Sequence, residues 1–138
     1  WRFVVRLHPN LLSDERVSQI EKMFPNAIDA TLYPDIQELL YTSDVLLTDY
    51  SSSVFDFMYT RRPCFLYVPD KDEYDRGFYW DFSDLPFPNF SSIAQAEEII
   101  SNFDEDTYKE TIETFLVCIG DKETGHAAES VYNILQSC

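Results

Sequence analysis

The segment Val45–Phe57, VLLTDYSSSVFDF, places an acid and three consecutive serines between two apolar runs. The first run is typical of a buried strand and the second of a helix, so the serines are expected at a helix N-terminus. Unpaired N–H groups at such an end attract phosphate, and small hydroxyl side chains can add further donors. We therefore identify Thr48, Ser51, Ser52 and Ser53 as candidate phosphate-binding residues. The alternative is that Ser51 or Ser52 only caps the helix.

Two acidic residues flank these serines. Asp49 could fix their turn by accepting hydrogen bonds from serine N–H groups, and we count it among the candidate substrate-binding residues. Asp56 lies one turn into the expected helix and could accept hydrogen bonds from ribose hydroxyls. A solvated residue that interacts with the helix dipole is the alternative for Asp56. The two acids are not spaced as a convincing acid–base pair, and no Ser-His-Asp arrangement can be argued.

Few side chains could balance the charge of a phosphate. His8 follows an apolar run and precedes a proline, where an imidazole can donate to a diphosphate, with a structural role as the alternative. Arg6, within the same run, and Arg76, beside the single glycine of a long loop, are candidate anion donors. Arg61 and Arg62 are more typical of a helix end.

Alternating strand and helix patterns position these residues. Apolar runs predict strands over Phe3–Leu7, Ala27–Leu32, Val45–Leu47 and Cys64–Val68. Helices are expected over Ser13–Met23, Ile36–Thr42, Ser51–Tyr59, Ile93–Asn102, Glu105–Val117 and Ala127–Gln136, with an irregular segment over Tyr74–Phe90. This alternation favours a Rossmann-like α/β fold with a parallel sheet and flanking helices.

Open parallel sheets bind ligands outside the carboxyl ends of their strands. His8 follows the first predicted strand, Thr48–Ser53 the third, and the loop Tyr74–Tyr79 comes after the fourth. Their expected convergence at one edge is the main argument from the residues for a binding site.

Composition limits the classes of function. The chain has 138 residues, which is enough for one domain with a core. With only three glycines, the chain has no glycine-rich phosphate loop of the Walker or dinucleotide-binding type. Its net charge of −15 disfavours nucleic acid and anionic lipid as partners. Cys64 and Cys118 lie in apolar runs and are expected in the core. The cysteine spacing predicts no zinc site and favours a reducing, cytosolic setting. No apolar run approaches the ~20 residues of a membrane span.

Three stretches resemble one known family. These stretches are RLHPN, DIQELLYTSDVLLTDYSSSVFDFM and RPCFLYVPDKDEYDRGFYWDF. In order and spacing they are similar to the carboxyl-terminal half of the CDP-glycerol glycerophosphotransferases. This family includes teichoic-acid primases and polymerases and their capsule-synthesis relatives, and the similarity covers Phe3–Phe87. It implies one half of a GT-B fold, with residues 1–138 as a single nucleotide-binding domain. The chain is then expected to be a piece of a longer protein, whose amino-terminal acceptor domain is absent from it. LPFP departs from the glycine-containing LPGP usual in relatives.

The resemblance also implies an activity. Such enzymes use no cofactor and move glycerol phosphate, or a related polyol phosphate, from CDP-glycerol or CDP-ribitol to a hydroxyl of a membrane-linked glycan. The product is a teichoic-acid or capsule polymer. The full-length protein is expected in the cytoplasm, peripherally on the inner face of the membrane, and the isolated chain is expected to bind its donor weakly and to turn nothing over.

Individual roles follow from the same resemblance. His8 would contact the donor diphosphate and aid the departure of CMP, as the catalytic residue. Ser51 and Ser52 would bind phosphate or ribose, Asp56 would take the acidic ribose-binding position, and Arg76 would lie in a loop that closes over the donor.

Two other functions remain open at the level of sequence. A GT-B glycosyltransferase that uses a nucleotide sugar would share the same pocket. A non-catalytic α/β interaction module of the response-regulator type would need an acidic pair, a phosphorylatable aspartate and a later lysine in the sheet, and the acids here lack that usual pairing.

Overall fold

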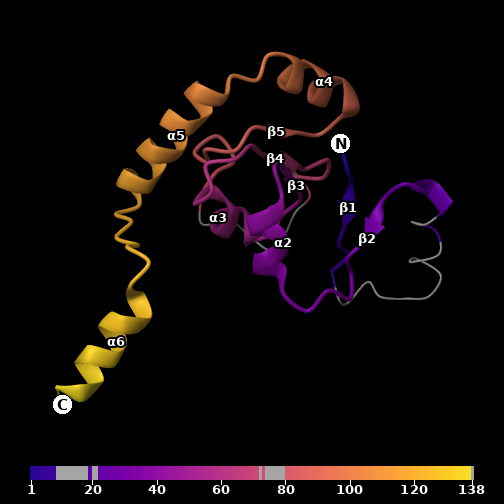
Figure 1. The fold of residues 1–138 in the computed structure, drawn as a ribbon. Helices are drawn as coiled ribbons and strands as arrows, with labels where there is room; N and C mark the ends of the chain where they lie inside the picture. The colour runs from indigo at the N-terminus through magenta and orange to yellow at the C-terminus, as the bar shows by residue number, and fades with distance from the viewer. Residues whose placement is uncertain (9–18, 20–21, 72, 74–79, 138) are drawn as a thin grey trace. The chain divides into compact units, whose positions relative to one another are not determined.

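A computed structural model describes residues 1–8, 19, 22–71, 73 and 80–137 of the chain (Figure 1). The chain divides into two compact units, Trp1–Leu40 and Tyr41–Cys138, and each is described by itself. Most of the helix expected over Ser13–Met23 lies outside the described residues, as does Arg76 with its loop. The single nucleotide-binding domain expected over residues 1–138 stays a prediction.

The first unit contains a two-stranded parallel sheet. β1 (Val4–Val5) pairs with β2 (Ile28–Asp29), which confirms two predicted strands and their direction. Both are shorter than expected. Beyond Val5 the ladder ends, because the N–H of Leu7 donates to Thr31 Oγ1 at 3.2 Å rather than to a backbone carbonyl.

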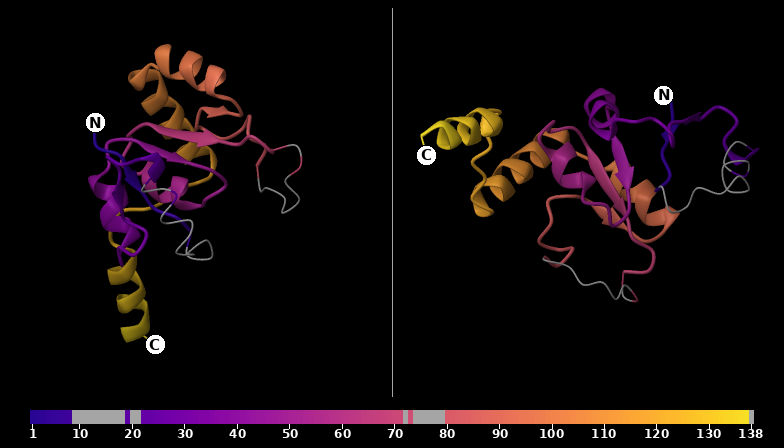
Figure 2. Two further views of the ribbon diagram at one scale, coloured as in Figure 1. Left: turned by 90° about the vertical axis from the view of Figure 1, so that its right-hand side faces the viewer. Right: turned by 90° about the horizontal axis from the view of Figure 1, so that it is seen from below.

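The second unit is built on a three-stranded parallel sheet in the order β3–β4–β5, whose strands lie side by side in Figure 2. β3 (Leu46–Thr48) and β4 (Cys64–Tyr67) are joined by α3 (Ser53–Met58), and β5 (Asn89–Phe90) pairs with β4. The parallel strands confirm the predicted α/β class. β5 is a correction to the irregular segment expected over Tyr74–Phe90, since two paired residues are too few to give a strand periodicity.

The other helices agree with their expected bounds to within one residue. They are α2 (Ile36–Thr42), α4 (Ile93–Ser101), α5 (Glu105–Cys118) and α6 (Ala127–Gln136). Local signals set their ends: Thr107 N donates to Asp104 Oδ1 at 2.7 Å where α5 begins, and Gly120, with a φ of +71°, follows the end of that helix.

The core of the second unit is contributed by β4, α3, α5 and the segment before β5. Its most fully buried side chains are Phe57, Met58, Cys64, Val68, Phe87 and Ile112. In α3, Val54, Phe57 and Met58 are buried at spacings of three and four, which place them on one face of the helix. Phe65 of β4 meets Phe103 edge-on, with ring centroids 5.1 Å apart.

The two described cysteines differ in their environment. Cys64 is buried, as expected, and this burial raises the pKa of its thiol to about 12. The expectation for Cys118 is wrong, because its side chain is exposed. It is the last residue of α5 and lies off the helix face that buries Ile112, Phe115 and Leu116.

Truncation of Ile112 tests this core. Ile112→Ala should lower the free energy of unfolding by about 2–5 kcal/mol, because it removes buried atoms and leaves a cavity. The control is Val117→Ala on the same helix, where the side chain is 80% exposed. It should change the free energy of unfolding by less than about 0.5 kcal/mol. Urea denaturation at pH 7 measures both, and equal effects would contradict this description of the core.

Candidate functional site

The serine turn, Thr48–Ser53, runs from the carboxyl end of β3 to the first residue of α3. The serines precede a helix, as the sequence predicts, but the helix begins at Ser53 and not at the expected Ser51. Ser51 and Ser53 are half-buried, whereas Asp49 and Ser52 are exposed. The hydroxyl oxygens of Ser51 and Ser53 share a hydrogen bond of 2.8 Å. The turn therefore presents several small polar groups at the edge of the sheet where ligands bind in open α/β folds.

The serines of this turn divide their roles. Ser53 N donates to Ser51 Oγ at 3.3 Å, so Ser51 satisfies one N–H group at the start of α3. Ser52 is the N-cap residue by position, yet its side chain makes no capping hydrogen bond. No serine N–H donates to Asp49 among the described residues, and Ser51 Oγ is the acceptor that fixes the turn. A substrate-binding role for Asp49 stays a prediction. The cap interpretation thus holds for Ser51 and leaves the Ser52 hydroxyl available to a ligand.

A hydrogen bond that the sequence analysis missed braces the serine turn. The hydroxyl of Tyr50 donates to Asp70 Oδ1 at 2.6 Å. Asp70 follows β4, so this contact joins the turns at the carboxyl ends of two neighbouring strands. The ring of Tyr50 also meets Phe82 edge-on, with centroids 6.0 Å apart. A tyrosine inside the polar run and an aspartate after the next strand were the available signal, but their pairing across twenty positions is not visible in the sequence.

Asp56 lies in the first turn of α3, where the sequence placed it. Its side chain is exposed and makes no ion pair or hydrogen bond within the described part of the chain. The preceding residue anchors the helix, because Phe55 packs against Trp80 and Phe87 at centroid distances of 5.6 and 6.0 Å. The carboxylate of Asp56 is therefore held on a fixed helix with its acceptor oxygens open to a ligand.

In the first unit, His8 lies beyond the carboxyl end of β1 and is exposed. The backbone just before it is fixed by the hydrogen bond from Leu7 N to Thr31 Oγ1. Thr31 is itself oriented by Asp29, whose Oδ1 accepts from Thr31 N at 2.8 Å. Hydrogen bonds from the side chain and backbone of Thr31 lower the pKa of Asp29. The convergence of His8 with the serine turn stays a prediction, because the two lie in different units.

Arg6 is engaged with the backbone of the first unit. Its Nη1 donates to the carbonyl oxygens of Ala30 and Tyr33, at 3.4 and 2.5 Å. These bonds support the segment after β2, and a donor-binding role for Arg6 stays a prediction. Arg76 lies outside the described residues.

Arg61 and Arg62 act at helix ends, as their positions suggested. Arg61 Nη1 donates to the carbonyl oxygen of Tyr59 at the end of α3, while its Nε pairs with Glu113 at 2.7 Å. Arg62 Nη1 donates to the carbonyl oxygens of Tyr41 and Ser43, at 2.6 and 2.8 Å, where α2 ends.

Two further searches cover only the residues that the structure describes. Among them, no group of three or more histidine, cysteine, aspartate or glutamate side chains is arranged to hold a metal ion. None of the helices in the same residues is both long and apolar enough to cross a membrane.

Comparison with known proteins gives a consistent result. The family model described as CDP-Glycerol:Poly(glycerophosphate) glycerophosphotransferase matches residues 1–137. The teichoic acid poly(glycerol phosphate) polymerase of Staphylococcus epidermidis is 35% identical over 115 residues, which cover 79% of this chain and 16% of that protein. The teichoic acid poly(ribitol-phosphate) polymerase of Bacillus spizizenii is 32% identical over 134 residues, which cover 94% of this chain and 21% of that protein.

Solved structures of the wall teichoic acid polymerase TagF are also similar. A variant soaked with CDPG matches with a TM-score of 0.76 and 30% identity, over 97% of this chain and 34% of that one. This likeness confirms the fold class expected from the sequence. The chain spans about a third or less of the length of each of these three proteins.

The brace between Tyr50 and Asp70 gives a testable prediction. Tyr50→Phe should lower the free energy of unfolding by about 0.5–1.5 kcal/mol, because it removes one hydrogen bond. It should also speed amide hydrogen exchange at Ser51–Ser53. The control is Tyr67→Phe, because the Tyr67 hydroxyl bonds to no described residue. A double-mutant cycle with Asp70→Ala should be non-additive. Strictly additive effects would show that the two residues are not coupled.

Proposed function

This chain belongs to the CDP-glycerol:poly(glycerophosphate) glycerophosphotransferase family, and on that basis we propose that it is the donor-binding part of such a transferase. The complete enzyme would transfer glycerol phosphate, or a related polyol phosphate, from a CDP-alcohol to a hydroxyl acceptor. The family match over residues 1–137 carries the proposal. The serine turn supports this proposal, because the turn lies at the carboxyl end of β3 and the Ser52 hydroxyl makes no capping hydrogen bond.

The charge of the chain shapes how a donor could be held. A net charge of −15 repels a diphosphate, so binding requires local donors that outweigh the overall field. In the second unit these donors are the hydroxyls of the serine turn and the N–H groups beside them. Asp56 is placed to accept hydrogen bonds from the ribose hydroxyls. His8 and Arg76 would add donors to the diphosphate.

The reaction would be a direct displacement at the β-phosphorus of the donor. The acceptor oxygen forms a new bond to this phosphorus, the bond to the bridging oxygen breaks, and CMP leaves with the electron pair. The acceptor hydroxyl releases its proton to solvent, so the products are CMP, the extended acceptor and one proton. His8 would donate to the diphosphate and offset the charge that develops on CMP, as hydrogen-bond donors do in other phosphoryl transfers.

The proposal also covers the identity of the donor and of the acceptor. Relatives include a poly(glycerol phosphate) polymerase and a poly(ribitol-phosphate) polymerase, so the donor is proposed to be CDP-glycerol or CDP-ribitol. The acceptor is proposed to be a membrane-linked glycan bound by a part of the enzyme outside this chain. The complete enzyme would act in the cytoplasm, peripherally on the membrane, and would need no cofactor.

Donor binding can be measured on the 138-residue chain by nuclear magnetic resonance. CDP-glycerol or CDP-ribitol should shift the amide signals of Ser51–Ser53 and Asp56 more than CMP does, and UDP-sugars should leave them unchanged. Ser52→Ala should weaken donor binding about tenfold, because one hydrogen bond to a charged phosphate is lost. Ser130→Ala on the exposed helix α6 is the control. Shifts with UDP-sugars alone would overturn the CDP-alcohol assignment in favour of a glycosyltransferase.

The role of His8 is tested in the full-length enzyme that contains this chain. His8→Ala should reduce turnover by a factor of about 10²–10⁴, because a donor at the departing group is lost. Circular dichroism should show an intact fold. Val117→Ala should leave turnover unchanged. Near-normal turnover of the His8 variant would rule out the role assigned to this residue.

A further inference from the structure

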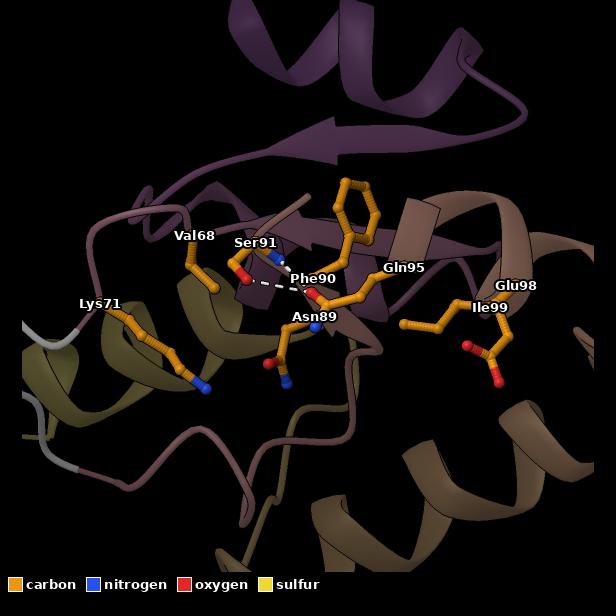
Figure 3. Close-up of a pocket in the computed structure, with 8 residues that line it drawn as sticks. All are labelled: Val68, Lys71, Asn89, Phe90, Ser91, Gln95, Glu98 and Ile99. Atoms are coloured by element: carbon orange, nitrogen blue, oxygen red, sulfur yellow. Dashed lines mark hydrogen bonds between the residues drawn. The ribbon is translucent and has the colours of Figure 1, made fainter. Parts of the chain in front are cut away.

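Figure 3 shows a pocket of about 320 Å³ at the carboxyl ends of β4 and β5. Lys71 lines this pocket, and the preceding Asp70 accepts the hydrogen bond from Tyr50 of the serine turn. On its other side, Gln95 Oε1 accepts from Ser91 N at 2.9 Å. The pocket therefore adjoins the site already described. A separate network of hydrogen bonds lies in the first unit, directly before His8.

This network begins where β1 leaves its sheet. Near the end of the ladder, Ala30 N donates to Val5 O at 2.8 Å. Hydrogen bonds in a parallel ladder are evenly spaced, so the next one would join Leu7 N to Ala30 O. Leu7 N instead donates to Thr31 Oγ1 at 3.2 Å. One side chain therefore turns the chain out of the ladder immediately before His8.

The carbonyl group that this exchange leaves behind has a different partner. Arg6 Nη1 donates to Ala30 O at 3.4 Å. Both the Leu7 N–H and the Ala30 carbonyl are thus satisfied by side chains, as backbone groups in a folded protein require. The departure of β1 from its ladder is therefore stable and needs no ligand.

Thr31 is itself held firmly. It is the single buried polar side chain among the described residues, with 6% of its surface exposed. Its hydroxyl and its N–H both donate to the carboxyl group of Asp29, the N–H at 2.8 Å, and these bonds lower the pKa of Asp29. A hydroxyl that donates to a carboxylate is also a better acceptor, because linked hydrogen bonds polarise one another. The oxygen that accepts from Leu7 N therefore has a defined position.

This position matters for the residue that follows Leu7. His8 precedes Pro9, and a residue before proline is restricted to extended conformations. Its backbone is thus limited by the proline on one side and by the Thr31 bond on the other. The His8 side chain is exposed, so core packing does not fix it and the backbone that carries it matters more. A displacement of about 1 Å at a catalytic group can cost about 10²-fold in rate.

We propose that Thr31, oriented by Asp29, is a positioning residue for His8. Its hydroxyl holds Leu7 N out of the ladder and so sets where the His8 imidazole meets the donor diphosphate. Without this acceptor, Leu7 N would pair with Ala30 O, β1 would lengthen, and His8 would move with it. Thr31 itself would touch neither donor nor acceptor. The inference rests on the proposed function for the catalytic role of His8.

The position of His8 can be tested on the 138-residue chain by nuclear magnetic resonance, without any substrate. Thr31→Val keeps the shape of the side chain and removes the acceptor, so the Leu7 amide and the His8 imidazole signals should shift. Thr31→Ser retains the hydroxyl and should leave them in place. Thr114→Val, on an exposed threonine of α5, is the matched control, and the imidazole of His126 is the internal reference.

Turnover is measured in the full-length enzyme that contains this chain. Thr31→Val should lower kcat by about 10–100-fold, because His8 is displaced, and should leave KM for the CDP-alcohol unchanged. Thr31→Ser should restore kcat, which loss of a methyl group with a merely structural role would not do. In the His8→Ala background, Thr31→Val should have no further effect, because the two residues act as a unit. Thr114→Val should leave kcat unchanged.

A second variant keeps the inference testable if Thr31→Val does not fold. Asp29→Asn removes an exposed charge that orients Thr31, so the fold should persist. It should shift the same Leu7 and His8 signals and lower kcat by a smaller factor than Thr31→Val.

The outcomes separate this inference from the proposed function. If His8→Ala abolishes turnover and Thr31→Val does not change it, the positioning inference fails and the role of His8 stands. A further loss from Thr31→Val in the His8→Ala background would also overturn the inference. If His8→Ala has near-normal turnover, the role of His8 fails. The shifts of the Leu7 and His8 signals then decide whether Thr31 positions this residue, and unchanged signals would overturn the inference.

Discussion

The second unit depends on the central strand β4 and on its parallel hydrogen bonding to both neighbours. Cys64, Phe65, Leu66 and Val68 are buried, so this strand and the residue after it form the inside of the unit. Because β3, β4 and β5 run in the same direction, their carboxyl ends meet at one edge. The serine turn after β3 and Asp70 after β4 lie at this edge for that reason. A different strand order would scatter them.

The serines of the serine turn have two possible roles, to cap helix α3 and to bind a ligand, and the structure assigns these roles to different serines. Helix α3 needs a partner for its first N–H groups, and Ser51 supplies it. A bound phosphate needs polar groups that are not already engaged, and Ser52 retains such a group. The described arginines differ from Ser52, because Arg6, Arg61 and Arg62 already donate hydrogen bonds to backbone carbonyls. Among the described residues of the second unit, the polar groups left open at the serine turn are therefore uncharged and are not arginines.

Local signals made much of this fold predictable. Helices such as α5 were placed well because their apolar spacing, acidic N-cap and terminal glycine all lie within a few residues of each other. The parallel sheet followed from the alternation of strands and helices. β5 was missed because two paired residues carry no periodicity, and Cys118 was misplaced because an apolar run alone does not reveal which face of a helix is buried. The bond between Tyr50 and Asp70 depends on strand pairing, which no single segment encodes.

This last bond has a consequence for the thermodynamics of ligand capture. A turn that must be ordered by its ligand spends part of the binding free energy on lost conformational entropy. Here the turn after β3 is fastened to the turn after β4 by a side-chain contact of 2.6 Å, so its ordering accompanies folding. The serine turn is in this sense preorganised. For the donor proposed above, less of the binding free energy would then be spent on ordering the turn than at a mobile loop.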